Sequence, residues 1–188
     1  DGNMEGRLLN PGHACETLGF IIEALQKDGP DLEYYLERRP KVQEKISLAG
    51  VDTVGMLISR MVEWNLIKGW DSEYGGIFYY KDALDFPLEK LEWTMKLWWV
   101  HVESAVAALE AYKLSRMEPL RDWFEKIHSY MWEKFRRPEN KEWYGYLSRQ
   151  GVSTHDLAGG KWKGFFHLPR ALMNMILIIE TETKNSTN

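Results

Sequence analysis

The sequence predicts an all-α fold in which inner and outer helices alternate around a central axis. In some segments the apolar residues cover most of the helix circumference, which is typical of a buried helix. In others they form a single stripe, which is typical of an outer helix. A short stretch of glycines and aromatic residues follows each outer segment. Because this order repeats along the chain, it indicates an α/α toroid, in which each helical hairpin packs on its neighbours.

The first helical hairpin is expected in the N-terminal third of the chain. Residues 10–13 (Asn-Pro-Gly-His) read as a turn into an inner helix over about 14–27, which is apolar on most sides. The sequence Asp-Gly-Pro-Asp at 28–31 is expected to end this helix. The charged residues 31–45 fit a short helix, and 47–67 carry the single apolar stripe of an outer helix.

The rest of the chain repeats this order. Glycines followed by aromatic residues predict short aromatic β-hairpins near residues 76–81 and 143–149. The expected helices are an inner one over 98–114, an outer one over 118–135 and a last inner one that begins near 168 and ends near 182. We expect residues 1–188 to form a single domain with a polar tail from about residue 183.

Composition limits the possible functions. A chain of 188 residues can form one domain with a substantial core. A formal net charge of −4 argues against general nucleic-acid binding, and charges interrupt every apolar run before it reaches membrane-spanning length. The single cysteine, Cys15, excludes an internal disulfide and fits a reducing compartment. With no recognisable secretion signal at the start, we expect a cytoplasmic protein that binds neither membrane nor nucleic acid.

The stretch Trp162–Arg170 is the strongest candidate for a functional site. Pro169 fits the first turn of a helix, which places His167 just before that helix and Arg170 on its first turn. Together with Lys163, these side chains gather at a helix start, where free backbone donors favour an anionic or carbonyl oxygen. The structural alternative is a core histidine and an arginine paired with a carboxylate, and spacing alone leaves both interpretations open.

The inner helices are expected to begin at equivalent points of the repeat. One fixed spacing aligns Glu103 with Arg170, and a second aligns Glu16 with Glu103 and Glu23 with Glu110. Equivalent helix starts lie on one rim of a toroid. The side chains expected to face a central cavity from this rim are His13, Glu16, Glu103, His167 and Arg170.

Four motifs resemble the N-acylglucosamine 2-epimerase family, whose animal members are also called renin-binding proteins. The motifs occur in the family's order and cover about residues 10–180. They are Asn10–His13 with Glu16, Leu91–Trp99 with Glu103, Glu142–Arg149, and Lys163–His167 with Pro169 and Arg170. The resemblance implies an α/α barrel of six helical hairpins, of which this chain looks like about half, the C-terminal part.

The resemblance also implies a reaction. The family interconverts N-acylglucosamines and N-acylmannosamines, such as N-acetylglucosamine and N-acetylmannosamine, by removing and returning the proton at C2. Two bases that flank one carbon suit this chemistry, and histidine titrates near neutral pH. Carried over from the family, the acid/base residues are His13 and His167, with Glu16 and Glu103 holding or polarising the site.

Other side chains of the motifs are expected to bind the sugar. Arg170 and Lys163 would stabilise the enolate oxygen that forms when C2 loses its proton. Trp98, Trp99 and Trp162 would stack on the sugar or line the wall of the cavity. The chain departs from the family at Leu18-Gly19 and Val100, and over residues 26–69.

The resemblance implies an isomerase that requires no cofactor or metal and acts on an amino sugar. It further implies ATP as an allosteric activator, a homodimer, and renin as a partner. Three alternatives remain open from the sequence. The first is a related sugar isomerase or disaccharide 2-epimerase, and the second is a non-catalytic protein of the renin-binding type. The third is a glycoside hydrolase with Glu16 and Glu103 as its carboxylates, which leaves both histidines without a role.

Overall fold

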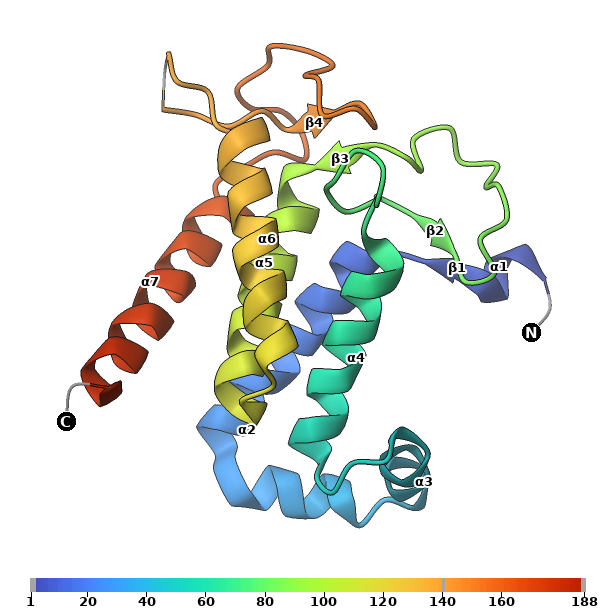
Figure 1. Ribbon diagram of the computed structural model, residues 1–188, viewed down its shortest axis with the longest axis vertical. Coiled ribbons are helices and arrows are strands. Elements are labelled where there is room, and N and C mark those ends of the chain that lie inside the picture. Colours follow the sequence, from blue (N-terminus) through green and yellow to red (C-terminus); the bar gives the residue numbers. More distant parts are fainter. Residues whose placement is uncertain (1–2, 140, 187–188) are drawn as a thin grey trace.

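The computed structural model describes residues 3–139 and 141–186. Most of these residues are helical, and the short strands and long loops gather at one end of the helices (Figure 1). The helices are α1 (Met4–Arg7), α2 (Pro11–Glu37), α3 (Pro40–Ala49), α4 (Val54–Gly69), α5 (Trp98–Ser115), α6 (Glu118–Lys134) and α7 (His167–Ser186). The strands are β1 (Leu8–Leu9), β2 (Lys81–Asp82), β3 (Lys96–Leu97) and β4 (Tyr146–Leu147). The prediction of an all-α fold with minor β structure is therefore confirmed.

Helix α5 is the centre of the fold. Every residue from Trp98 to Ala111 is buried, and α5 packs against α2, α4, α6 and α7. Its many alanines explain this position, since small side chains let neighbouring helices approach closely on several sides. These alanines are Ala105, Ala107, Ala108 and Ala111. The predicted inner helix over 98–114 is confirmed almost to the residue.

Helices α4 and α6 form the outer layer and run antiparallel to α5 (Figure 1). Helix α4 buries Ile58, Val62 and Leu66 on one face and exposes Met61 and Trp64 on the other. The predicted start of this helix at residue 47 is wrong, because α3 already occupies 40–49. Gly50 ends α3 in the left-handed conformation (φ 63°). Thr53 then starts α4, since its side chain accepts a hydrogen bond from the backbone N–H of Met56 (3.2 Å).

Helix α2 breaks where the sequence predicts. At the stop expected at 28–31, Gly29 has non-helical dihedral angles (φ 59°, ψ −140°) and Pro30 follows. Two helical segments therefore meet at a kink, and the second continues to Glu37. Gly29 allows the change of direction because glycine adopts a positive φ at little cost.

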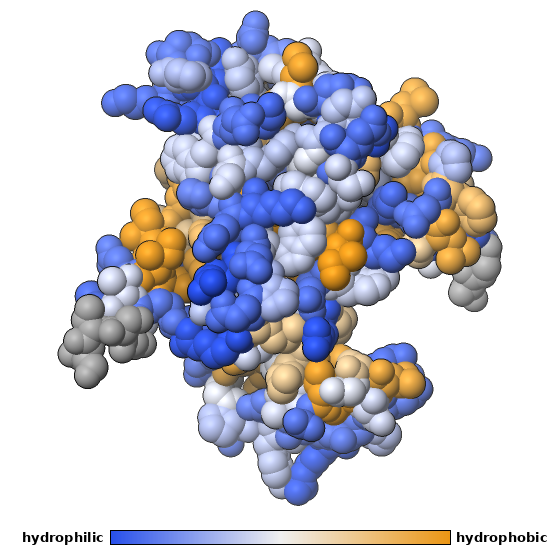
Figure 2. Space-filling model, viewed as in Figure 1, coloured by the Kyte–Doolittle hydropathy of each residue, from blue (hydrophilic) through white to orange (hydrophobic). Residues whose placement is uncertain are grey.

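The predicted full burial of the first and last inner helices is wrong. On α2 the buried side chains lie on one face, and on α7 they are those of Ala171, Met175 and Ile178. Met173 and Leu177 of α7 are exposed by 62% and 59%, and this helix gives the apolar edge at the left of Figure 2. The reason is that α7 packs on α5 along one face while its apolar residues lie on several.

The end of α7 also differs from the prediction. The helix begins at His167 and continues through Ser186, so it ends later than the predicted end near residue 182. The remaining tail residues, 187–188, lie outside the described residues. None of the helices described here has the length and hydropathy needed to span a bilayer.

The first predicted aromatic hairpin does not form as expected. Strand β2 pairs antiparallel with β1, with Leu8 opposite Asp82. The tight turn lies earlier, where Gly75 and Gly76 both have positive φ (74° and 76°) and the backbone N–H of Asp71 donates to the carbonyl of Gly76 (2.8 Å). This turn closes the antiparallel bridge from Trp70 to Ile77.

The second predicted hairpin is confirmed in part. Leu147 forms an antiparallel bridge with Ser153, and the backbone N–H of Ser148 donates to the carbonyl of Val152 (2.8 Å). In addition, β4 pairs antiparallel with β3, so Lys96 lies opposite Leu147. This pairing fixes the residues immediately before α5.

Candidate active site

The starts of α2, α5 and α7 lie together at the strand end of the molecule (Figure 1). At α2, the side chain of Asn10 caps the helix by accepting a hydrogen bond from the backbone N–H of His13 (3.1 Å). At α5, the backbone N–H of Trp98 donates to the carbonyl of Gly145 (3.0 Å), next to β4. At α7, His167 is the first helical residue. The equivalent helix starts expected from the repeat are therefore adjacent in space.

A cavity of about 330 Å³ at this end is lined by both candidate histidines. The indole of Trp99 packs against both rings, with its centre 4.6 Å from that of His13 and 5.6 Å from that of His167. The lining residues are His13, Tyr79, Leu97, Trp98, Trp99, Tyr146, Trp162 and His167. The structure thus brings both histidines and all of the candidate tryptophans to one cavity.

His167 is held by carboxylates behind it. Its Nδ1 lies 2.7 Å from Oε1 of Glu103 and 3.7 Å from Oε1 of Glu16. Glu103 is only 2% exposed, so little solvent competes for this contact. A carboxylate accepts the Nδ1 proton and fixes the tautomer, which leaves Nε2 as the nitrogen that can take up a proton.

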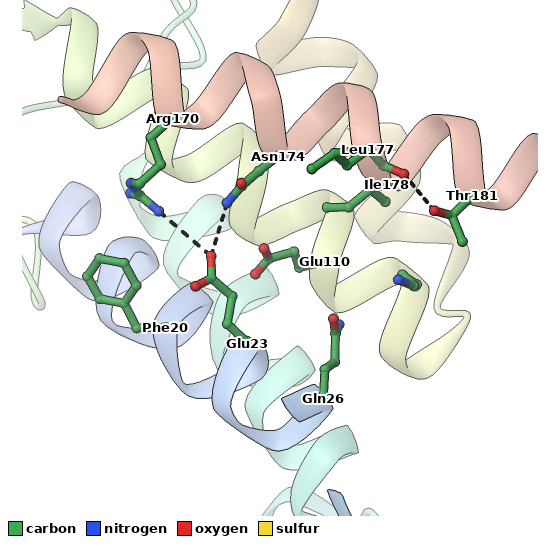
Figure 3. A pocket seen from close by; sticks show the side chains of 10 residues that line it. Phe20, Glu23, Gln26, Glu110, Arg170, Asn174, Leu177, Ile178 and Thr181 are labelled. Carbon is green, nitrogen blue, oxygen red and sulfur yellow. Dashed lines mark hydrogen bonds and ion pairs between the residues drawn. The ribbon is translucent and has the colours of Figure 1, made fainter. Parts of the chain in front are cut away.

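Arg170 supports this pair from the side away from the histidine cavity. Its Nη2 donates to Oε2 of Glu103, and its Nη1 lies 3.8 Å from Oε1 of Glu23. It lines a second cavity, between α2, α5 and α7, which is shown in Figure 3. In this position Arg170 orients Glu103 and balances its charge, and it does not line the cavity that contains His13.

Lys163 is also absent from the lining of the histidine cavity. Its Nζ donates to the carbonyl of Ala158 (2.6 Å) and lies 3.2 Å from Oε1 of Glu142. The lysine is only 8% exposed. It lines a neighbouring pocket, next to Trp98. The sequence suggested that Lys163 contacts the substrate, but in the structure its ammonium lies outside the histidine cavity.

Tyr79 and Tyr146 line the histidine cavity although neither was selected from the sequence. Burial raises the pKa of both phenols, so each hydroxyl is neutral near pH 7 and can donate a hydrogen bond. Both lie in the aromatic segments that the sequence marks as hairpins. The signal was therefore present, but alternation in an irregular segment does not tell which side chain faces a cavity.

His101 plays a structural part. Its Nδ1 lies 2.7 Å from the carbonyl of Leu97, and its Nε2 accepts a hydrogen bond from the backbone N–H of Ile77 (2.8 Å). Burial lowers its pKa to about 3, so the ring is neutral. It joins the glycine turn to the first turn of α5.

A buried ion pair fixes the same region. Asp71, in the glycine turn, lies 3.1 Å from Nζ of Lys96 and 2.9 Å from Nε of Arg149. Burial opposes ionisation of Asp71, but the hydrogen bonds and charges of these two cations lower its pKa to about 2. Burial lowers the pKa of Lys96 to about 8 although Asp71 opposes this. The pair ties the turn, β3 and the chain after β4 together beside the cavity.

The carboxylates near His167 form a hydrogen-bonded cluster. One ligand-type atom from each of Glu16, Glu103 and His167 lies within 4.8 Å of the others. The contact of 2.7 Å between Glu103 and His167 is that of a charge-assisted hydrogen bond. Arg170 also occupies the second oxygen of Glu103. The two carboxylates are therefore arranged to orient the imidazole of His167.

Known proteins match this chain in sequence and in fold. The model of the family described as N-acylglucosamine 2-epimerase (GlcNAc 2-epimerase) matches residues 1–171. The N-acylglucosamine 2-epimerases of Rattus norvegicus and Homo sapiens are 36% and 38% identical over 168 residues, which is 89% of this chain. The chain spans only 35% and 34% of their lengths, a smaller share than the half of the barrel that the sequence suggested.

Solved structures confirm the α/α toroid arrangement of the helices. A D-mannose isomerase superposes with a TM-score of 0.70 at 17% identity, over 92% of this chain and 37% of its own. The cellobiose 2-epimerase of Spirochaeta thermophila gives a TM-score of 0.69 at 19% identity, over 94% of this chain and 39% of its own. From the match of the family model and the shared fold, the chain belongs to the N-acylglucosamine 2-epimerase family.

Proposed function

We propose that this chain forms part of the active site of a sugar 2-epimerase that interconverts N-acetylglucosamine and N-acetylmannosamine. The observation that carries this proposal is that His13 and His167 line one cavity and both pack against Trp99. Family membership and relatives that are named N-acylglucosamine 2-epimerase support the choice of substrate.

The reaction needs a proton acceptor on each face of C2. In the open-chain sugar, C2–H lies next to the aldehyde, so removal of the proton gives an enolate. Nε2 of His167 accepts the proton from one face, and Glu103 stabilises the imidazolium that results. His13 returns a proton on the other face, which inverts C2. The same steps run backwards convert the product to the substrate.

The enolate oxygen needs hydrogen-bond donors in the cavity. Arg170 and Lys163 are bound to Glu103 and Glu142, so they are not positioned for this role. Tyr79 and Tyr146 both line the cavity, but the side chain of Tyr79 is hydrogen-bonded to Tyr80. The neutral hydroxyl of Tyr146 is therefore the donor we assign to the enolate oxygen. Trp99 and Trp162 provide ring faces for the sugar.

The substrate assignment is tested with a chimaera in which this chain replaces the matching segment of the rat relative. We expect the chimaera to convert N-acetylmannosamine to N-acetylglucosamine and to leave mannose and cellobiose unchanged, as followed by chromatography. Conversion of mannose or cellobiose alone would assign the site to a related isomerase or disaccharide 2-epimerase. No conversion of any sugar by a folded chimaera would contradict the proposal.

We expect the 188-residue chain by itself to show little or no turnover, because it spans only 35% of the rat relative. The same chromatographic assay measures this. Turnover at the level of the chimaera would contradict the expectation and would indicate that further copies of the chain complete the cavity.

Proton transfer by two histidines requires no cofactor or metal. Dialysis of the chimaera against EDTA should leave its kcat unchanged, because His13, His167 and the carboxylates supply all of the proton-transfer groups. A rate that falls after dialysis and returns with one divalent cation would contradict this part of the proposal.

We further propose the regulation and assembly that the family resemblance suggests: a cytoplasmic homodimer that is activated by ATP and binds renin. Sedimentation of the chimaera with and without renin tests the dimer and the partner. Turnover with and without ATP tests activation. The dimer, the binding of renin and the activation by ATP are therefore tested separately.

A further inference from the structure

The facing sides of α2, α5 and α7 carry two tiers of polar side chains. The upper tier is the cluster of Glu16, Glu103 and His167, of which His167 lines the histidine cavity. Each of these residues has a counterpart about two helical turns further along its own helix. These counterparts form the lower tier: Glu23 on α2, Glu110 on α5 and Asn174 on α7 (Figure 3). The lower tier lines a cavity of about 360 Å³.

Arg170 lies between the two tiers and contacts both. Its Nη2 donates to Glu103 of the upper tier, and its Nη1 lies 3.8 Å from Oε1 of Glu23 in the lower tier. Asn174 donates to the same oxygen of Glu23 (3.0 Å). A single guanidinium is therefore shared between carboxylates of both tiers, and the balance between them determines how firmly it holds Glu103.

Glu110 has no partner that fixes its charge. It is 3% exposed, and neither its Oε2 nor Nε of Arg170 has a hydrogen-bond partner among the described residues. The charged groups that act on it are Glu23 from α2, Arg170 from α7, and Glu103 and Lys113 from its own helix. A second negative charge in the lower tier would therefore compete with Glu103 for Arg170.

We propose that Glu110 is a positioning residue of the active site. While it is protonated, Arg170 stays on Glu103; when it ionises, it draws the guanidinium into the lower tier and loosens the contact between Glu103 and His167. The effect on catalysis rests on the function proposed above, whereas the movement of Arg170 does not.

The electrostatics of the lower tier support this. Burial raises the pKa of Glu110 to about 8, and the negative charge of Glu23 adds to this effect. The carboxyl is therefore mostly protonated at neutral pH and ionises under mildly alkaline conditions. At that point three carboxylates, those of Glu23, Glu103 and Glu110, share one guanidinium.

The movement of Arg170 can be measured in the 188-residue chain by ¹⁵N NMR of its guanidinium. In the wild type we expect these signals to shift with a midpoint near the pKa of Glu110. In Glu110→Gln, which keeps the size of the side chain, they should keep their low-pH positions throughout. In Glu23→Gln the midpoint should move to lower pH, because a negative neighbour of Glu110 is removed. Signals that do not move in the wild type, or that move equally in Glu110→Gln, would overturn the proposal.

Stability gives a second readout that does not depend on activity. The pKa of Glu110 is raised in the folded state from an ordinary value of 4.5, so the unfolded chain ionises first. Protonated Glu110 therefore contributes stability at low pH that is lost as the pH rises from 4.5 to about 8. The Tm of Glu110→Gln relative to wild type should rise over this window and level off above it. A constant difference would contradict the assigned ionisation.

The consequence for catalysis is measured in the chimaera. Wild-type kcat should fall by up to about tenfold per pH unit above the midpoint, and this fall should be absent in Glu110→Gln while KM is similar in both. If Arg170 moves but the two kcat profiles coincide, Glu110 has no positioning role. If neither chimaera turns over any sugar, the proposed function fails, and the NMR result alone decides whether Glu110 controls Arg170.

Discussion

In the chimaera, His167→Gln should lower kcat for N-acetylmannosamine by about a hundredfold to ten-thousandfold, the range that is typical of losing a positioned acid/base. Glutamine is close in size to histidine but takes up no proton near neutral pH. Because Glu103 orients the imidazole through Nδ1, the variant removes the proton acceptor at Nε2 while most of the cavity wall remains. KM should change much less than kcat, since Trp99 and Trp162 still line the cavity.

The matched control is His128→Gln on the outer helix α6. Nε2 of His128 accepts a hydrogen bond from the indole of Trp132 (2.7 Å), and this histidine does not line the cavity. The kcat of the His128→Gln variant should equal that of the wild type. A similar loss in both variants would trace the effect to folding, and a wild-type rate in His167→Gln would remove His167 from the mechanism.

Asp71→Asn should destabilise the chain by about 3–5 kcal/mol, as expected when one partner of a buried ion pair is removed. Lys96 is fully buried and would lose its negative partner. Its ammonium would keep the neutral amide oxygen of the substituted side chain, the carbonyl of Gly76 (3.4 Å) and the ring of Phe78 (3.8 Å) nearby. Chemical denaturation at neutral pH measures the change. The aspartate has a lowered pKa, so the stability that it contributes is present above about pH 4 and is lost as the pH falls toward 2.

The double variant Asp71→Asn/Lys96→Met separates the charge effect from packing. Methionine fills the space of the lysine stem without a buried charge, so the double variant should recover much of the lost stability. The ion pair of Arg7 and Asp82 (3.1 Å) offers a comparison, because the side chain of Arg7 is 19% exposed. Removing Arg7 should therefore destabilise the chain less than Asp71→Asn does. A double variant as unstable as Asp71→Asn would contradict the assignment of the cost to the unpaired lysine.

The helices that pack on several sides were predictable from the sequence. Helix α5 has apolar residues on all sides and is buried almost throughout, and α6 shows one clear stripe and ends where expected. The break in α2 at Gly29 and Pro30 was also predictable. The break between α3 and α4 lies later in the chain than predicted, at Gly50. The apolar run of α7 indicates helix but does not say how much of it other elements cover.

The positions of the two candidate histidines and of the carboxylates behind them were predictable. The repeat aligned the starts of the inner helices, and His13, Glu103 and His167 lie together as that alignment requires. The places of the cations were not predictable, because Arg170 and Lys163 are directed by carboxylates on other segments. The position of the charged group of a long, flexible side chain depends on such distant partners. Spacing along one helix does not show these partners.

In the proposed reaction, His13 and His167 transfer protons on opposite faces of C2. The most direct measurement is exchange of the C2 hydrogen with solvent deuterium, followed by NMR for each epimer in chimaeras that carry His13→Ala or His167→Ala. We predict that each variant loses epimerisation but still exchanges the C2 hydrogen of one epimer, and that the retained epimer differs between the two variants. Wild-type exchange of both epimers in either variant would contradict the claim.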